Sequence, residues 1–565
     1  MRVFPMFNRF VGAVVLSVAL GAAATAQIVV NSATKDGDTV KGQHRFRVTV
    51  QSQSLVSQVE FYVKGNLVAT DESTPYEYTI DTLGFDDGPL AVVVAAYNAD
   101  GNSQRVTLNL TVDNGLAKGV AHHVAVAEGL LIEQKWDQAI QTCRVALKIS
   151  STDNTARLAM ARAYFGKGIY DLAQKFAEDV VESDPSNVAA RELLSGISLR
   201  QAFRAMTTSS DRDQTLTIVS SALRSAASSR RSALGAMIET FGVVTPENRM
   251  SYTDRLMEAG RFSLVIDQLT PVFNTDERDS QLANRLAYAQ LRAGRYAEAR
   301  TTMTRHMRRG EPDAYGFALK AVIDDWFGDA QGSANAEREA LLYDPSDLGV
   351  RTAQAFLALR RGNNATFASI ATNVAQSTSA SPITNYYLSA MYYLQAQFDS
   401  SDNAFQAGLL ADPAMYHLYI ERFNQSVSFY FSSKPSGDDK SYQIAFAKSF
   451  AEGALEAKPE SFEALTALAL INFIDGKLDD AIRLGQAAVA AGPQYGAAHY
   501  TLAGAYFARN MSVEGQRAMV EAAKYDKHLD GIRAPKVEEA WRYFYRYGRT
   551  PLLSVRGAQP APLVS

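Results

Sequence analysis

Between residues 28 and 114, hydrophobic and polar residues alternate, as they do in β-strands that bury one face. The stretch HRFRVTVQSQ places Phe46, Val48 and Val50 on the same side of such a strand. In VSQVEFYVKGNLVAT, two strand-like runs are joined by KGN at residues 64–66, which favours a hairpin turn. Turn-forming Asp, Asn and Gly residues separate about seven short strands, a number that predicts a β-sandwich.

The pattern changes near residue 118, where hydrophobic positions begin to recur at helical spacing. The stretches LMEAGRFSLV (256–265) and QLRAGRYAEA (290–299) are similar and lie 34 residues apart. Four glycines follow one another at the same spacing: Gly260, Gly294, Gly328 and Gly362. Two antiparallel helices of about 12 residues with two short turns use this length of chain. The spacing therefore predicts stacked helix pairs, with Gly where the turn needs a left-handed backbone.

These positions resemble the tetratricopeptide repeat family. In residues 154–185, the crossing, turn and terminal positions of such a repeat are filled by Ala161, Tyr164, Gly168, Tyr170, Ala173 and Pro185. In residues 462–493, they are filled by Ala469, Asn472, Gly476, Leu478, Ala481 and Pro493. Asn472 departs from the usual aromatic residue. The resemblance implies an all-α solenoid of helix-turn-helix repeats that binds a protein or a peptide.

The strand region resembles the bacterial Ig-like domains of exported proteins. The resemblance rests on VEFYVKGNLVATDESTPYEYTID followed by DDGPLAVVVAAYNADGN. It implies an all-β Ig-like sandwich that acts as a spacer or an adhesion module. Some domains of that family bind carbohydrate.

The expected organisation is multidomain. Its parts are a signal peptide (1–26), a bacterial Ig-like β-sandwich (28–114), a first tetratricopeptide array (118–200), an irregular helical connector (201–245), a second array (246–415), an enlarged helical repeat with a polar loop (416–461), a third array with a capping helix (462–547) and a disordered tail (548–565). Within the arrays, Ala161, Ala287 and Ala469 are expected where paired helices cross.

The first residues have the features of a secretory signal peptide. Arg2 and Arg9 flank a short apolar run, and the sequence Ala-Thr-Ala ending at Ala26 fits a cleavage site. We therefore expect export with processing before Gln27, to the periplasm, the cell surface or the medium. The alternative is an N-terminal membrane anchor. After signal removal no transmembrane segment is expected.

Charge and motif content argue against several functions. Lys and Arg number 56 against 60 Asp and Glu, so the chain offers no general positive field for nucleic acid. No phosphate loop, dinucleotide fingerprint, nucleophile elbow or zinc-protease motif occurs in the sequence. No catalytic residue and no cofactor are therefore predicted. The single cysteine, Cys143, lies in an apolar helical pattern, which indicates a buried thiol.

No metal is predicted either. Asn98, Asp100 and Asn102 offer oxygen ligands at alternate positions, as calcium sites do, but Asx residues in a turn need no ion. His122 and His123 are adjacent and point to different helix faces, so we expect one of them to pack in the first repeat.

The remaining candidate is a concave groove, because the first helix of each repeat lines the inside of such a stack. Aromatic and Arg side chains there suit the capture of a protein or peptide by stacking and bidentate contacts. The groove candidates are Tyr288, Arg292, Tyr315, Trp326, Phe356, Arg360, Tyr386 and Tyr393. The alternative for each is packing between repeats, and a row of aromatic rings also suits sugar rings.

These observations predict a non-catalytic, exported bacterial scaffold that binds a protein or peptide in the groove, with the Ig-like domain as spacer or adhesion module. The alternative is a polysaccharide-binding or adhesive protein of the cell envelope. A hydrolase is the weakest hypothesis, because no segment outside the two folds is large enough for a catalytic domain.

Overall fold

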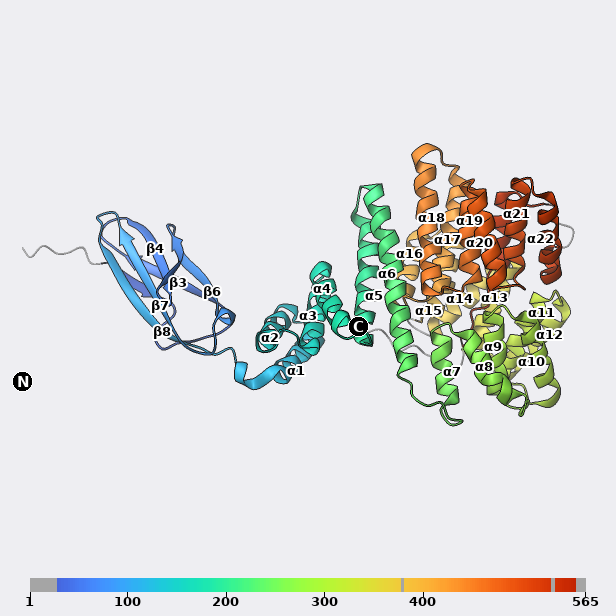
Figure 1. The fold of residues 1–565 in the computed structure, drawn as a ribbon, viewed down its shortest axis with the longest axis horizontal. Helices are drawn as coiled ribbons and strands as arrows, with labels where there is room; N and C mark the ends of the chain where they lie inside the picture. Colours follow the sequence, from blue (N-terminus) through green and yellow to red (C-terminus); the bar gives the residue numbers. More distant parts are fainter. Residues whose placement is uncertain (1–27, 378–380, 530–533, 555–565) are drawn as a thin grey trace, which may run out of the picture. The chain divides into compact units, whose positions relative to one another are not determined.

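The computed structural model describes residues 28–377, 381–529 and 534–554. The expected signal peptide and residues 555–565 lie outside this part. The chain divides into two compact units, Met1–Met160 and Ala161–Ser565. Figure 1 draws the strands of the first unit and the helices that follow them along the chain.

The first unit begins with a β-sandwich. One sheet has the order β1-β3-β6 and the other the order β2-β8-β7-β4-β5. The strands are β1 (Val29–Ser32), β2 (Thr39–Val40), β3 (Gln43–Gln51), β4 (Val56–Val63), β5 (Asn66–Asp71), β6 (Tyr76–Asp81), β7 (Gly88–Asn98) and β8 (Ser103–Val112). All pairings are antiparallel except β2 with β8.

The alternation seen in the sequence places the core of the sandwich. Phe46 and Val48 of β3 are buried against Val59 and Phe61 of β4 in one hydrophobic cluster, and Val50 packs at its edge. The expected hairpin joins β4 to β5, and Lys64 and Gly65 both adopt positive φ there. The predicted all-β sandwich is therefore confirmed.

The rest of the chain is helical. The helices are α1 (Gly119–Ile132), α2 (Trp136–Ile149), α3 (Asn154–Gly166), α4 (Tyr170–Ser183), α5 (Val188–Thr208), α6 (Arg212–Glu239), α7 (Arg249–Glu258), α8 (Phe262–Phe273), α9 (Ser280–Arg292), α10 (Tyr296–Arg309), α11 (Ala314–Trp326), α12 (Ala330–Tyr343), α13 (Leu348–Arg361), α14 (Asn364–Ser377), α15 (Pro382–Leu394), α16 (Phe398–Ala411), α17 (Tyr416–Ser433), α18 (Gly437–Ala457), α19 (Phe462–Ile474), α20 (Leu478–Ala491), α21 (Gly496–Ala508), α22 (Ser512–Tyr525) and α23 (Val537–Tyr547). Up to α22 they follow one another as helix pairs, which confirms the predicted all-α repeat solenoid.

The 34-residue period arises at the turn inside nine of the helix pairs. At this turn one residue adopts a left-handed backbone, whatever its type: Gln134, Gly168, Gly260, Gly294, Gly328, Gly362, Ala396, Gly476 and Asn510. Glycine adopts this conformation without strain, whereas other residues are strained there. Ala161, Ala287 and Ala469 are each fully buried in the first helix of a pair. The turn and a small buried residue on the first helix thus recur together.

Two helix pairs are longer than the others. Of residues 201–245, expected as an irregular helical connector, 201–208 belong to α5, which begins at Val188, and 212–239 belong to α6. Asp211 caps α6 through two backbone amides, and no residue of the turn 209–211 adopts positive φ, so the glycine of the 34-residue pattern is absent there. The enlarged repeat consists of α17 and α18, and α18 packs along α6.

The second unit closes on itself, because its later repeats pack against its middle ones (Figure 1). The backbone amide of Ala297 in α10 donates to Gln494 Oε1 over 3.0 Å. Arg546 of α23 donates to the carbonyl oxygen of Arg361 over 2.8 Å. One hydrophobic cluster therefore extends from Leu199 to Leu553.

Candidate functional site

The predicted groove residues occupy the first helices of four consecutive repeats. Tyr288 and Arg292 lie on α9, Tyr315 and Trp326 on α11, Phe356 and Arg360 on α13, and Tyr386 and Tyr393 on α15. Seven of the eight are buried, and Tyr393 is partly buried. We call the surface formed by these eight residues, together with Thr352 and Tyr387, the inner surface.

Four residues of the inner surface, Tyr288, Thr352, Tyr386 and Tyr387, contact the chain's own residues 548–554, which we call the C-terminal segment. This segment has no regular secondary structure. Arg549, Thr550, Leu552 and Leu553 are all buried. The sequence predicted a disordered tail from residue 548, and the structure differs for these seven residues. That prediction followed from their position near the end of the sequence, but several of their partners lie in repeats more than a hundred residues away.

Side chains of the repeats hold the backbone of this segment. Tyr387 donates its hydroxyl to the carbonyl oxygen of Leu552 over 2.7 Å. The amide of Leu553 donates to Tyr288 Oη over 3.5 Å, and the amide of Ser554 donates to Thr352 Oγ1 over 3.1 Å. The inner surface thus satisfies polar backbone groups that a helix or sheet would otherwise satisfy.

Polar side chains of the segment find specific partners as well. Arg549 forms a buried ion pair with Glu421 of α17 and donates to Tyr386 Oη over 3.0 Å. Thr550 donates to Glu463 Oε1 of α19 over 2.8 Å. Buried charges are tolerated when they are paired and hydrogen-bonded, as these are.

Arg360 occupies a second charged position, next to the start of the segment. Its guanidinium lies 4.4 Å from the centre of the Trp326 ring and pairs with Asp325 at 3.1 Å. It also donates to the carbonyl oxygen of Tyr547 over 2.6 Å. Trp326 in turn stacks on Tyr296 with ring centres 4.1 Å apart. Only 1% of Arg360 is exposed, so its cation is held entirely by the chain itself.

A third charged position surrounds Arg292 and Lys458. Arg292 donates to the hydroxyls of Tyr288 and Tyr416, over 2.6 and 3.2 Å. Lys458 Nζ lies over the rings of Tyr416 and Phe462 and donates to the carbonyl oxygen of Arg292 over 3.4 Å. Burial lowers the pKa of Lys458 to about 8.

Burial also sets the protonation of two neighbouring groups. The pKa of His417 is lowered well below its usual value, first by burial and then by the charge of Arg292, so its ring is neutral. Burial alone would raise the pKa of Asp526, but hydrogen bonds from His528 and Tyr543 and the charge of Arg360 outweigh it and hold this pKa below the usual value.

Three residues outside the inner surface that the sequence singled out have structural roles. Cys143 is buried, and burial raises the pKa of its thiol to about 12, so it is protonated at neutral pH. Asn98 Oδ1 accepts from the amides of Asp100 and Asn102, which closes a turn. His123 is buried and contacts the carbonyl oxygen of Gly115 at 2.8 Å. Within the described ranges, no group of His, Cys, Asp and Glu is placed to hold a metal.

Sequence reasoning missed the residues that hold the segment most directly. Tyr387 and Thr352 lie beside predicted candidates on the same helices, and Glu421 and Glu463 lie on later ones. A carboxylate within an otherwise apolar helix is a usable signal, as in SFEALTALAL around Glu463. Its partner was not recognisable, because that partner is the chain's own tail.

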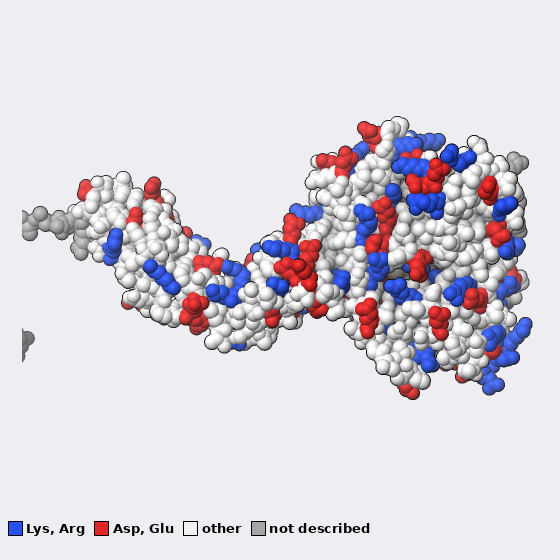
Figure 2. Space-filling model, viewed as in Figure 1, with Lys and Arg blue, Asp and Glu red and all other residues white. Residues whose placement is uncertain are grey.

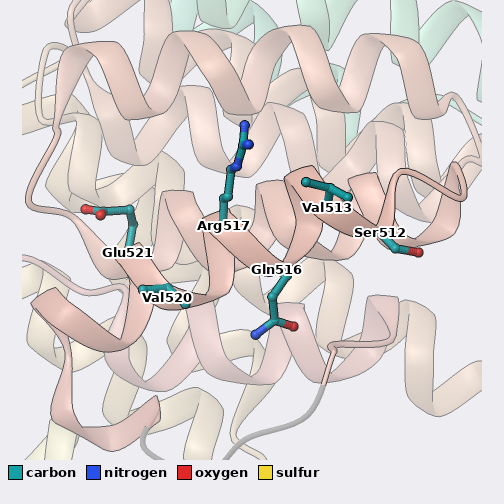
Figure 3. A pocket seen from close by; sticks show the side chains of 6 residues that line it. All are labelled: Ser512, Val513, Gln516, Arg517, Val520 and Glu521. Carbon is teal, nitrogen blue, oxygen red and sulfur yellow. The ribbon is translucent and has the colours of Figure 1, made fainter.

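A depression on the outer surface is formed by a single helix. Figure 3 shows a shallow depression whose side chains all project from α22, among them Val513 and Val520. One helix face of this kind encloses no ligand. Figure 2 shows basic and acidic side chains interspersed over the helices it draws. Within the described part of the chain, every helix is too short or too polar to cross a lipid bilayer.

Comparison with known proteins identifies both folds. A family model described as bacterial Ig domain matches residues 29–117. Two tetratricopeptide repeat models match residues 130–197 and 447–496. The search of curated proteins gave no match.

Similar solved structures include one module and two helical proteins. The fibronectin(III)-like modules of CbhA from Clostridium thermocellum share 25% identity, over 15% of this chain and 94% of theirs, with a TM-score of 0.14. The Cut9–Hcn1 hetero-tetramer of the APC/C shares 11% identity, over 76% of this chain and 84% of that one, with a TM-score of 0.38. Yeast Tom70 shares 14% identity, over 77% and 98%, with a TM-score of 0.33. The chain thus contains a bacterial Ig domain at its N-terminus, followed by tetratricopeptide repeats.

Proposed function

We propose that this protein is a non-catalytic, exported bacterial scaffold that binds an extended segment of another protein on its inner surface. One observation carries the proposal: the inner surface holds an extended piece of polypeptide by its backbone, through Tyr288, Thr352 and Tyr387. Side chains that satisfy backbone amides and carbonyls can hold many sequences, because every residue presents these groups.

The rest of the molecule fits a binding role. Tetratricopeptide and Ig-like families are generally non-catalytic, and tetratricopeptide repeats generally mediate binding between proteins. The bacterial Ig domain at residues 29–117 is compatible with export, and the expected signal peptide supports it. In this proposal the Ig domain is a spacer or an adhesion module.

Binding of polysaccharide was the alternative. Sugar rings stack on open aromatic faces, whereas seven of the eight groove candidates are buried beneath polypeptide. The polar side chains of the inner surface also contact the amides and a carbonyl group of residues 552–554, which are groups that every peptide presents. We therefore favour a protein segment as the ligand.

The test uses the full chain with the C-terminal segment dislodged. Leu553 is 1% exposed, so Leu553→Asp would bury a charge and should drive the segment off the inner surface. We expect this variant to enrich extended peptides from a random display library. Leu342→Asp, at an exposed position, is the matched control and should enrich none.

The role of the backbone contacts is tested in the same variant. Adding Tyr288→Phe and Tyr387→Phe removes two hydroxyls and little volume, and should weaken binding of the enriched peptides by about tenfold or more. The proposal fails if no peptide is enriched, or if the two Phe substitutions leave affinity unchanged. Export is checked separately by N-terminal sequencing, which should begin at Gln27.

A further inference from the structure

The C-terminal segment is attached to the body in the manner of a ligand. Among the described residues, no backbone–backbone hydrogen bond joins residues 549–554 to any helix. The last such bond upstream is that from Gly548 to Phe544, which ends α23. The segment lies after this helix, so its departure would break no helix–helix contact.

Without the C-terminal segment, a buried carboxylate beside the inner surface lacks its cationic partner. The side chain of Glu421 is fully buried and pairs with Arg549. Gln425 is the other residue that contacts this carboxylate, through its amide at 3.3 Å. A buried carboxylate without a cation is costly, so a ligand that replaces the segment must supply a basic group at this position.

Apolar side chains define the other end of the segment. Leu552 and Leu553 belong to the large hydrophobic cluster of the second unit, together with Tyr288 and Tyr387. These leucines follow Arg549 by three and four positions. Their burial removes apolar surface from water, whichever chain carries them.

We infer that residues 549–554 are a built-in, displaceable ligand of the inner surface, and that the partner's segment has the same pattern, a basic residue followed three and four positions later by two leucine-sized apolar residues. This inference rests on the proposed function, because it names the ligand of the same surface. The partner gains access when its segment replaces the chain's own.

The experiment adds a labelled peptide of residues 548–556, GRTPLLSVR, to the full chain carrying Leu553→Asp. We expect saturable binding in fluorescence anisotropy, and much weaker binding to the unmodified chain, whose own segment competes. A peptide with Arg549→Ala should bind at least about tenfold more weakly, because Glu421 then lacks its cation. Loss of discrimination between the two peptides overturns the inferred pattern.

The outcomes separate this inference from the proposed function. If display-selected peptides bind the variant and GRTPLLSVR does not, the inference fails and the proposed function stands. If neither binds, both fail. The unmodified chain could also form dimers by exchanging C-terminal segments, and Leu553→Asp should prevent this. Such dimers would support displacement of the segment, with a second copy of the chain as the protein that binds it.

A second measurement does not depend on how the variant folds. In the unmodified chain, the amides of Leu552, Leu553 and Ser554 should exchange with deuterium through local opening, faster than the core amides of α9 and α15. If these amides exchange only together with those of α9, the segment is a permanent part of the core and the inference is overturned.

Discussion

The helices α1 and α9 are both the first helix of a repeat, yet their surroundings are very different. In α1 only His123 and Ala127 are buried, and Ile132 is 84% exposed. In α9 every residue from Leu282 to Arg292 is buried. The repeat motif specifies how a helix packs against its own partner. Whether its other face is exposed or covered depends on chain that is remote in sequence.

Polar residues show the same contrast. The covered helix carries Arg285, Tyr288 and Arg292, each with a defined partner: Asp254, the amide of Leu553, and the hydroxyl of Tyr416. Such a set is costly to bury in a permanent core and natural on a surface that exchanges one polypeptide for another. The middle repeats therefore differ from the first in what covers them, not in fold.

The most severe break of the covered surface is Trp326→Ala combined with Arg360→Ala. It removes the stack on Tyr296 and the cation that pairs with both Asp325 and Asp526, and Asp325 then keeps only Arg361 as an ion-pair partner. Large cavities and broken buried ion pairs each cost about 3–5 kcal/mol, so we expect a loss of at least about 4 kcal/mol in unfolding free energy. Denaturant titration followed by circular dichroism measures it.

Phe398→Ala is the matched control for this double variant, because Phe398 is largely exposed. Its effect should stay below about 1 kcal/mol. A double variant as stable as this control would contradict the burial of the inner surface.

The extent of sequence prediction follows from the same contrast. The turn glycines and the buried Ala287 depend on neighbours within one repeat, so their spacing revealed the pairs. The sequence also predicted Tyr288 and Arg360 as binding residues on the first helices of their repeats. Their actual partners, Leu553 and Tyr547, lie 265 and 187 residues further along the chain. A single sequence carries no signal for contacts of that range.

The pair Arg549 and Glu421 tests the covering segment itself. Glu421→Gln removes the negative charge that Arg549 meets in the buried interior, and should cost about 3 kcal/mol in unfolding free energy. Adding Arg549→Met should recover part of this loss, since the unpaired cation is then gone. A double-mutant cycle by denaturant titration measures the coupling, and additive effects would show that the pair contributes nothing.

The buried Lys458 makes the unfolding free energy of the second unit depend on pH. Burial lowers its pKa from 10.5 to about 8, so between these values the unfolded chain holds a proton that the folded chain has lost. Stability therefore rises with pH through this window, and below about pH 8 the penalty is present in full. Lys458→Met removes the penalty, and we expect a gain of roughly 2–3 kcal/mol at pH 7 relative to its effect at pH 10.

The measurement is the difference in unfolding free energy between Lys458→Met and the unmodified chain at both pH values. The buried tyrosines titrate equally in both chains, so their contribution cancels. Lys448→Met, at a partly exposed position of α18 where Lys448 pairs with Glu452, is the matched Lys-to-Met control. A difference that is the same at both pH values would contradict the lowered pKa.

The smallest expected change in stability concerns the left-handed turn that both repeats contain. Gln134 follows α1 and Gly294 follows α9, and both adopt left-handed φ, of 57° and 72°. Gln134→Gly relieves the strain of a side chain in that conformation and should stabilise the first repeat by about 1 kcal/mol. Gln141→Gly, within α2, should instead cost up to about 1 kcal/mol. In the covered repeat, Gly294→Ala combines the strained φ with a Cβ 3.0 Å from Phe462, so it should cost more than strain alone.

Thermal melting of the three variants distinguishes a turn imposed by the motif from one imposed by its surroundings. If Gln134→Gly destabilises, the left-handed turn is not the origin of the 34-residue period.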